Sequence, residues 1–114
     1  MTKDKGMTWL EMINVRTARV IEAERVIELC RQSFQSLAVE KLLALTVYCS
    51  AKYPTDISIH FEWESDPRPG SILGSVVSSA LKEFGLISHT LWIKQKEFGI
   101  HHKLEMGLSQ IART

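Results

Sequence analysis

The stretch "ISIHFEWES", residues 57–65, alternates between apolar and polar side chains over almost its whole length. A period of two places successive side chains on opposite faces of a sheet, so this stretch predicts a half-buried strand. The apolar face would carry Ile57, Ile59, Phe61 and Trp63, and the other face Ser58, His60, Glu62 and Glu64. A histidine and a glutamate on the second face indicate either contact with water or the lining of a pocket.

The chain has 114 residues, of which 45% are hydrophobic and 24% charged, as is typical of one globular domain. We expect a single domain over 1–114, with its core at about 8–96. The net charge is +1 and the basic residues are scattered, which argues against binding of nucleic acid. No apolar run approaches the roughly 20 residues of a membrane span.

The N-terminal residues include lysines without an apolar segment of signal-peptide length behind them, so we expect a cytoplasmic protein. Cys30 and Cys49 then read as reduced, buried side chains. Their separation does not fit a CxxC redox motif, and the sequence leaves a disulfide between them as an alternative to two free thiols.

Three more segments have the composition or the alternation of strands. Residues 8–18 suit the middle of a sheet covered on both faces, since Leu10 and Met12 share a face with Asn14 and Arg16. Residues 41–56 form a strand and a turn that lead into 57–65, which makes a hairpin. Residues 86–98 predict the last strand, in which His89 shares a phase with apolar neighbours.

Two segments have the apolar spacing of amphipathic helices, at 21–37 and 71–85. In the second, Ser71 is expected to cap the start and Gly85 to end the helix in a left-handed conformation. The tail at 99–114 fits either a helix or a strand, with a preference for the helix.

The resulting order, β-α-β-β-α-β, predicts an α+β, ferredoxin-like fold with a four-stranded antiparallel sheet and two helices on one face. The opposite face would carry Asn14, Arg16, Thr46, Tyr48, His60, Glu62, Ser88, Thr90 and Trp92. Mixed aromatic and polar side chains suit a concave pocket or a wet subunit interface. A homodimer would close this face by setting two copies against each other.

The element order and the stretch "FEWESD" resemble the antibiotic-biosynthesis-monooxygenase-like proteins of the dimeric α/β-barrel class. The resemblance covers about 8–96 and matches Trp63 to the tryptophan that ends the third strand in that family. It implies a dimer whose sheets form a barrel around a ligand cavity. Many such proteins also have a histidine in the following helix, and residues 65–84 contain none, which argues against a haem-degrading or cofactorless oxygenase role.

The candidate chemistry lies on the polar face, where His60 and Glu62 stand two residues apart. A carboxylate can orient a histidine and raise its pKa, so His60 would be a general base and Glu62 its partner. Around them, Tyr48, Arg16, Asn14 and Trp92 would line the ligand cavity. The alternative is that His60 and Glu62 face solvent or meet across a dimer seam.

No metal or cofactor is expected. His101 and His102 are adjacent, so their side chains diverge on a strand or a helix and do not converge on one ion. The chain has no GxGxxG, Walker, HExxH or GxSxG motif, and "PRPGSILGS" lacks the lysine of a phosphate-binding loop.

Two functions remain open. The protein either holds, and could oxidise or deprotonate, a small aromatic or quinone-like molecule in a barrel cavity, or it is a non-catalytic binding or interaction module that uses the same face.

Overall fold

The computed structural model describes residues 8–100, so the expectations for His101, His102 and most of the tail lie outside the described residues. The chain runs β1 (Trp9–Thr17), α1 (Val20–Phe34), β2 (Leu42–Cys49), β3 (Asp56–Trp63), α2 (Leu73–Leu81), a 3-10 turn (Lys82–Phe84) and β4 (Gly85–Ile93). The strands form one sheet in the order β2-β3-β1-β4 and every neighbouring pair is antiparallel. The predicted ferredoxin-like fold is therefore confirmed.

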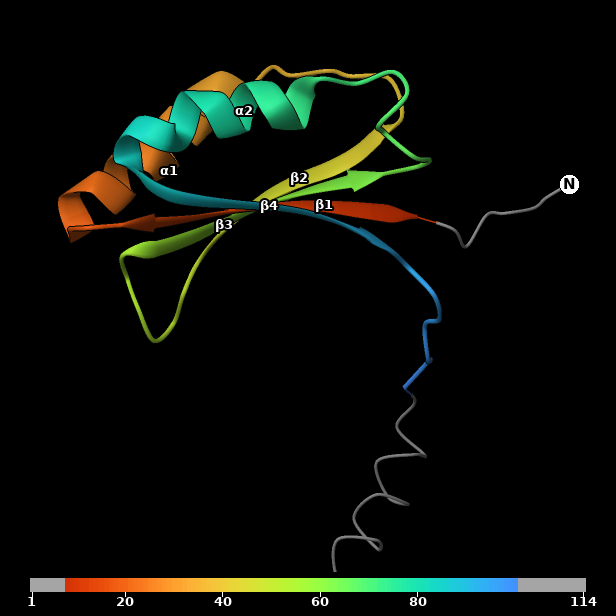
Figure 1. Ribbon diagram of the computed structural model, residues 1–114. Coiled ribbons are helices and arrows are strands. Elements are labelled where there is room, and N and C mark those ends of the chain that lie inside the picture. The colour runs from red at the N-terminus through yellow and green to blue at the C-terminus, as the bar shows by residue number, and fades with distance from the viewer. Residues whose placement is uncertain (1–7, 101–114) are drawn as a thin grey trace, which may run out of the picture.

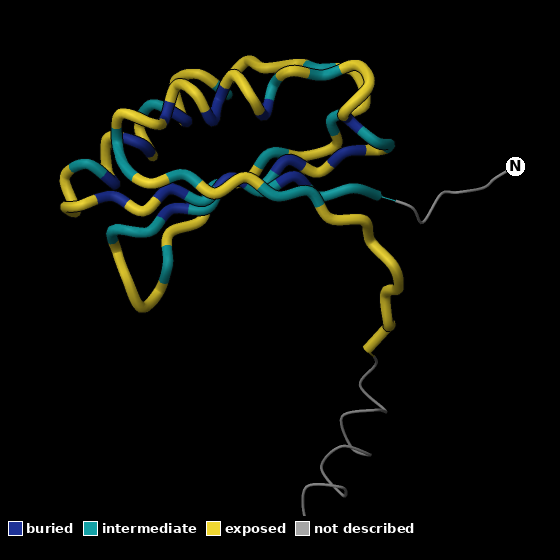
Figure 2. Tube along the Cα trace, in the orientation of Figure 1, coloured by how far each residue is buried: buried dark blue, intermediate teal, exposed yellow. Residues whose placement is uncertain are grey.

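Both helices cover the same face of the sheet and leave the other face open (Figure 1). The core lies between the two helices and the sheet (Figure 2). Ile13, Ile59, Phe61 and Val26 are completely buried there. Each large apolar side chain buried there contributes about 1.5–3 kcal/mol to the free energy of unfolding. None of the described helices is long and apolar enough to cross a membrane.

The register fixes which side chains share the open face. Across β1, Asn14 pairs with Ser58 and Ser88, and Met12 pairs with His60 and Thr90. On β2, Tyr48 pairs with Ser58 and Thr46 with His60. The residues expected on the face opposite the helices all lie there, namely Asn14, Arg16, Thr46, Tyr48, His60, Glu62, Ser88, Thr90 and Trp92.

Strand β2 departs from the predicted phase at its start. The alternation of residues 43–50 predicts that Leu43 shares the core face with Leu45 and Val47, but Leu43 is 53% exposed. A register shift between Leu42 and Ala44 explains the difference, because a bulge adds one residue to one strand only. As a result Leu42 packs against the core in place of Leu43.

The expected left-handed cap at Gly85 is wrong, since its φ is 168° and its backbone is extended. Glycine is required there for a different reason. Gly85 pairs with Thr17 at the end of β1, and a Cβ at position 85 would lie 2.1 Å from the carbonyl oxygen of Arg16. The expected cap at Ser71 is also wrong, since the N-cap of α2 is Ile72. Ser71 lies one residue earlier, and its hydroxyl accepts a hydrogen bond from the Leu73 amide at 3.2 Å.

The two cysteines are both free thiols. Cys30 is buried as expected, whereas Cys49 is exposed at the end of β2, so the expectation that both are buried is wrong for Cys49. Strand β4 ends at Ile93, five residues before the predicted end, because the chain leaves the sheet after Lys94.

Candidate functional site

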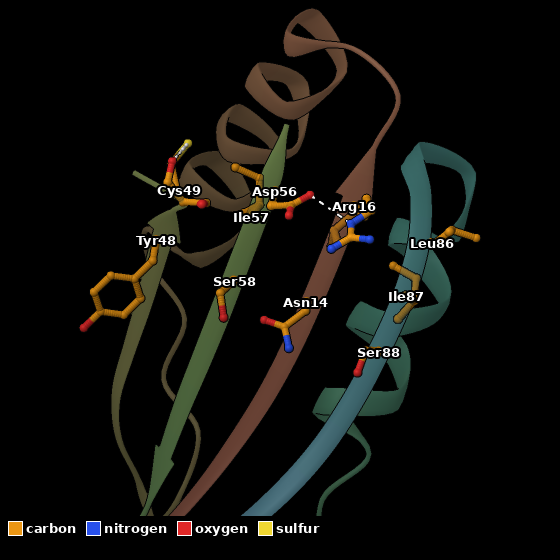
Figure 3. A pocket seen from close by; sticks show the side chains of 12 residues that line it. Asn14, Arg16, Tyr48, Cys49, Asp56, Ile57, Ser58, Leu86, Ile87 and Ser88 are labelled. Atoms are coloured by element: carbon orange, nitrogen blue, oxygen red, sulfur yellow. Dashed lines mark hydrogen bonds and ion pairs between the residues drawn. The ribbon is translucent and has the colours of Figure 1, made fainter. Parts of the chain in front are cut away.

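A hollow of about 520 Å³ lies at one end of the open face (Figure 3). Three of the predicted ligand-binding residues, Asn14, Arg16 and Tyr48, line it. The register brings Ser58 and Ser88 alongside Asn14, so hydroxyl and amide groups cover its floor. The volume lies within the range of cavities that hold small organic molecules.

Arg16 is the cationic group of this hollow. Its Nε donates to Oδ1 of Asp56 at 3.3 Å, while 71% of its side chain remains exposed. Exposed ion pairs contribute at most about 1 kcal/mol to folding, so the contact orients the guanidinium more than it stabilises the fold. The remaining guanidinium donors can bind an acceptor oxygen of a ligand.

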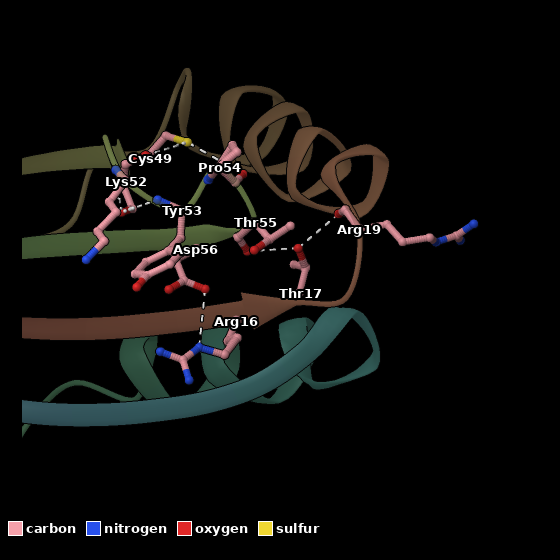
Figure 4. A network of polar contacts seen from close by, with 10 residues as sticks. Arg16, Thr17, Arg19, Cys49, Lys52, Tyr53, Pro54, Thr55 and Asp56 are labelled. Atoms are coloured by element: carbon pink, nitrogen blue, oxygen red, sulfur yellow. Dashed lines mark hydrogen bonds and ion pairs between the residues drawn. The ribbon is translucent and has the colours of Figure 1, made fainter.

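The turn that leads into Asp56, the first residue of β3, is held in place by a hydrogen-bond network (Figure 4). The hydroxyl of Thr17 contacts two carbonyl oxygens, those of Thr55 at 2.8 Å and Arg19 at 3.0 Å. The Ser50 hydroxyl accepts a hydrogen bond from the Tyr53 amide at 3.0 Å. These contacts join the β2–β3 hairpin to the end of β1 and so fix Asp56 opposite Arg16.

The other predicted site residues, His60, Glu62 and Trp92, lie on the same face but outside the lining of the hollow. They stand nearer the opposite end of the strands, where Leu10 pairs with both Glu62 and Trp92. Trp92 is 57% exposed, and its Nε1 donates to the Thr90 hydroxyl at 2.9 Å.

The surroundings of His60 differ from those expected. Its Nε2 lies 2.9 Å from the Ser58 hydroxyl, and its ring centroid lies 4.7 Å from that of Tyr48. Burial lowers the pKa of His60, whereas an orienting Glu62 would have raised it. Ser58 and Glu62 each lie two residues from His60 on β3, and it is the Ser58 hydroxyl that the ring nitrogen contacts.

A second group of polar side chains lies on the helix-covered face, away from all the site residues predicted from the sequence. Glu11 is a carboxylate on the apolar face of the inner strand β1 and is only 8% exposed. Its Oε1 accepts a hydrogen bond from Nε1 of Trp63 at 2.9 Å, and its Oε2 lies 2.6 Å from Nε2 of His89. Both oxygens therefore have partners, as a buried carboxylate requires.

Gly74 of α2 makes room for this carboxylate. A Cβ at position 74 would lie 1.8 Å from Oε2 of Glu11, so only glycine lets the helix approach so closely. The sequence did contain a signal for the group: Glu11 interrupts an apolar phase that includes Trp9 and Ile13, and His89 interrupts the phase of Ile87.

The Glu11–His89 pair borders a second hollow of about 320 Å³ between β4 and the start of α2. Ser71, Ser75 and Arg68 also line it. Arg68 is paired with Asp66 at 2.7 Å, and this contact lowers the pKa of Asp66. The hollow thus combines a histidine, a buried carboxylate, hydroxyls and a guanidinium.

When the Glu11 carboxylate is ionised it only accepts hydrogen bonds, and its contact with His89 then places a proton on Nε2 of the ring. In the neutral imidazole this leaves Nδ1 as the proton acceptor. Among residues 8–100, no group of three or more histidine, cysteine or acidic side chains is arranged to hold a metal ion.

No protein-family model matches the chain, and no curated protein matches it in sequence. In structure it is similar to a monooxygenase from Streptomyces coelicolor, solved with the ligand nanaomycin D, at a TM-score of 0.65 and 14% identity over 86% of this chain and 96% of that one. A dimeric ferredoxin-like protein from an uncultured marine organism matches at a TM-score of 0.59 and 17% identity, over 86% and 97% of the two chains. A cofactor-independent oxygenase from Streptomyces nogalater matches at a TM-score of 0.55 and 10% identity, over 81% of this chain and 96% of that one.

The predicted resemblance to antibiotic-biosynthesis-monooxygenase-like proteins is thus confirmed at the level of the fold. At identities this low, the similarity shows the ferredoxin-like architecture and does not carry the ligands or activities of those proteins over to this one.

Proposed function

We propose that this protein is a homodimer that binds a small aromatic or quinone-like molecule in a chamber formed where the open sheet faces of two copies meet. The observation that carries the proposal is the hollow of about 520 Å³ lined by Asn14, Arg16 and Tyr48. A soluble sheet left open to water would not favour the large apolar side chains that lie on this face, among them Leu86 at 74% and Trp92 at 57% exposure.

The chemistry of the hollow fits an aromatic ligand with oxygen substituents. Tyr48 is 52% exposed and offers a ring face for stacking. Arg16 offers a charge-assisted hydrogen bond to a carbonyl or phenolate oxygen, and Asn14 offers both a donor and an acceptor. The similar structure that holds nanaomycin D, and the one from a dimeric protein, support a ligand and a dimer for this fold.

The binding test compares two arginines that are equally exposed and equally paired. Arg16 is bound to Asp56 in the hollow, and Arg19 is bound to Glu22 at the start of α1, with exposures of 71% and 69%. We expect Arg16→Ala to weaken the binding of 1,4-naphthoquinone or 1,5-dihydroxynaphthalene about tenfold or more, because a charge-assisted hydrogen bond is lost. Calorimetry would measure the change in Kd. Arg19→Ala should bind as the parent does. Equal affinities for the two variants would contradict the assignment of the hollow.

A second function, proton abstraction from the bound molecule, is favoured by the histidines. His60 is the candidate base of the chamber, since burial lowers its pKa and keeps its ring neutral and able to accept a proton near pH 7. In this proposal the Ser58 hydroxyl orients the ring, and Glu62 supplies negative charge at the rim of the face. Oxidation of the deprotonated molecule would take dioxygen as co-substrate.

For a molecule bound in the second hollow, on the helix side, the candidate base is His89, whose ring Glu11 orients in the way that a carboxylate orients a catalytic histidine. The glutamine variant of Glu11 tests this role with little change in shape. An amide nitrogen would donate to Nε2 of His89 and move the ring proton to Nδ1, which removes the proton acceptor. We expect Glu11→Gln to change the ring 15N shifts of His89 in NMR spectra without unfolding the protein.

To distinguish the two candidate bases, oxygen uptake with a dihydroxynaphthalene is measured for His60→Gln and for His89→Gln. Loss of uptake in one variant alone assigns the base to that side of the sheet. Binding without uptake in the parent protein would reject catalysis of this substrate class and leave the non-catalytic binding module as the function.

A further inference from the structure

We propose that residues 94–100 form an arm that packs Phe98 and Ile100 against a second copy of this chain docked on the open face of the sheet. The inference rests on the homodimer proposed above and adds a part of the chain that the sheet face alone does not include. The term arm is used below for residues 94–100.

The arm leaves the sheet on the side away from the helices. The Lys94 amide still donates to the carbonyl oxygen of Thr8 at 2.9 Å, which continues the pairing of β4 by one residue. After this bond the chain bends towards the side of the open face and away from α1 and α2 (Figures 1 and 2). A second copy docked on the open face would lie along the path of the arm.

The arm is exposed throughout, yet it carries two large apolar side chains. Phe98 is 73% exposed and Ile100 is 68% exposed. The Phe98 ring has the ammonium group of Lys96 at 5.8 Å from its centroid, and Lys94 is paired with Glu97. These local contacts order the polar side of the segment and leave the apolar groups available to another surface.

The length of the arm matches the length of the open face. Seven extended residues reach about 23 Å, and strands of about eight residues span roughly 26 Å. An arm from each copy could therefore run along the open face of the other.

The charge of the arm suits the face on which it would lie. Lys94 and Lys96 give the arm a net positive charge beside Glu97, whereas the open face presents the exposed carboxylate of Glu62. The remaining part of that face is apolar near Leu10 and Trp92, which pair with each other across β1 and β4. An apolar contact bordered by opposite charges is the usual composition of a protein interface.

The experiment compares isoleucines that are equally exposed on opposite sides of the molecule. Ile100 lies on the arm at 68% exposure, and Ile72 lies before α2, on the helix side, at 74%. We expect Ile100→Ser combined with Phe98→Ser to raise the dimer Kd in sedimentation equilibrium about tenfold or more, since both anchors would lose buried apolar area in each copy. Ile72→Ser should leave the dimer Kd unchanged.

A photo-crosslinking measurement does not depend on how the serine variants fold. The full chain with p-benzoylphenylalanine in place of Phe98 should form crosslinked dimers, with crosslinked peptides from the open-face strands of the other copy. A mixture of isotopically labelled and unlabelled chains identifies crosslinks between copies.

The possible failures are distinguishable. A parent protein that stays monomeric at all concentrations overturns the homodimer and the arm together. A dimer whose Kd is unaffected by the serine substitutions, or crosslinks from position 98 only within one chain, overturns the arm and leaves the proposed chamber intact.

Discussion

Replacing Gly74 by alanine tests the Glu11 site most directly, because the added methyl group would occupy the position of the carboxylate. The new Cβ would lie 1.8 Å from Oε2 and 2.5 Å from Cδ of Glu11. Glu11 cannot move aside freely, since Trp63 and His89 hold its two oxygens. Either α2 must shift outward or both hydrogen bonds must break.

The expected cost follows from these contacts. Alanine gains at most about 1 kcal/mol over glycine in helix propensity. Against this, overpacking costs about 1–3 kcal/mol, and each hydrogen bond to a charged group contributes about 1.5–3 kcal/mol. We therefore expect Gly74→Ala to lower the free energy of unfolding by about 2–4 kcal/mol, measured by urea denaturation followed by circular dichroism at fixed protein concentration.

Gly70 provides the matched control, because a Cβ there would meet nothing within 4 Å and its φ lies outside the left-handed region. Gly70→Ala should leave stability unchanged or raise it by up to about 1 kcal/mol. In a Glu11→Ala background the clash is absent, so Gly74→Ala should cost little. The same loss in both backgrounds, or no loss in either, would refute the reasoning.

Three further outcomes are expected. Trp63→Phe should lower the free energy of unfolding by about 1–3 kcal/mol, because a buried carboxylate oxygen loses its donor. Trp92→Phe removes an exposed donor and should change the free energy of unfolding little. Equal losses of stability in the two variants would contradict this reasoning. Because burial lowers the pKa of His60 in the folded state, the unfolded state binds a proton more readily. Stability should then fall as the pH drops below about 6.5, the unfolded value, and level off below the folded value, in the parent but not in His60→Gln. Burial raises the pKa of Cys30 to about 11, so a thiol reagent at pH 8 should modify Cys49 rapidly and Cys30 only on unfolding, as mass spectrometry of the labelled protein would show.

Local alternation was sufficient to predict the sheet and its two faces. Ile57, Ile59 and Phe61 are buried and Ser58 and His60 lie on the open face, as the period of two requires. The order of the elements then determined the topology, because right-handed crossovers leave one arrangement for this order.

The departures from prediction depend on contacts between strands that no local pattern encodes. The bulge at the start of β2 reverses the side of Leu43, and the close approach of two backbones explains Gly85. The partner of His60 is likewise decided by side-chain reach across a pleated surface, where the Ser58 hydroxyl is bound and Glu62 is not. The sequence predicted Glu62 as the partner of His60, although Ser58 lies at the same distance of two residues.

The sequence signals the Glu11 site only as a polar residue within an apolar phase, which does not reveal the side chains on other elements that bind it. Three features that are separate in sequence are linked by this one carboxylate. Trp63 has its indole nitrogen satisfied in the core, α2 needs Gly74 where it passes over the sheet, and His89 has a buried acceptor at the sheet edge. A leucine at position 11 would pack without a desolvation cost but would leave the indole N–H without its acceptor. Glutamine would satisfy the indole as well as glutamate does, so hydrogen bonding to Trp63 alone does not account for a carboxylate. What only the carboxylate provides is an acceptor that holds the proton on Nε2 of His89, and this is the physical reason to seek chemistry on the helix-covered side of the sheet as well as in the chamber.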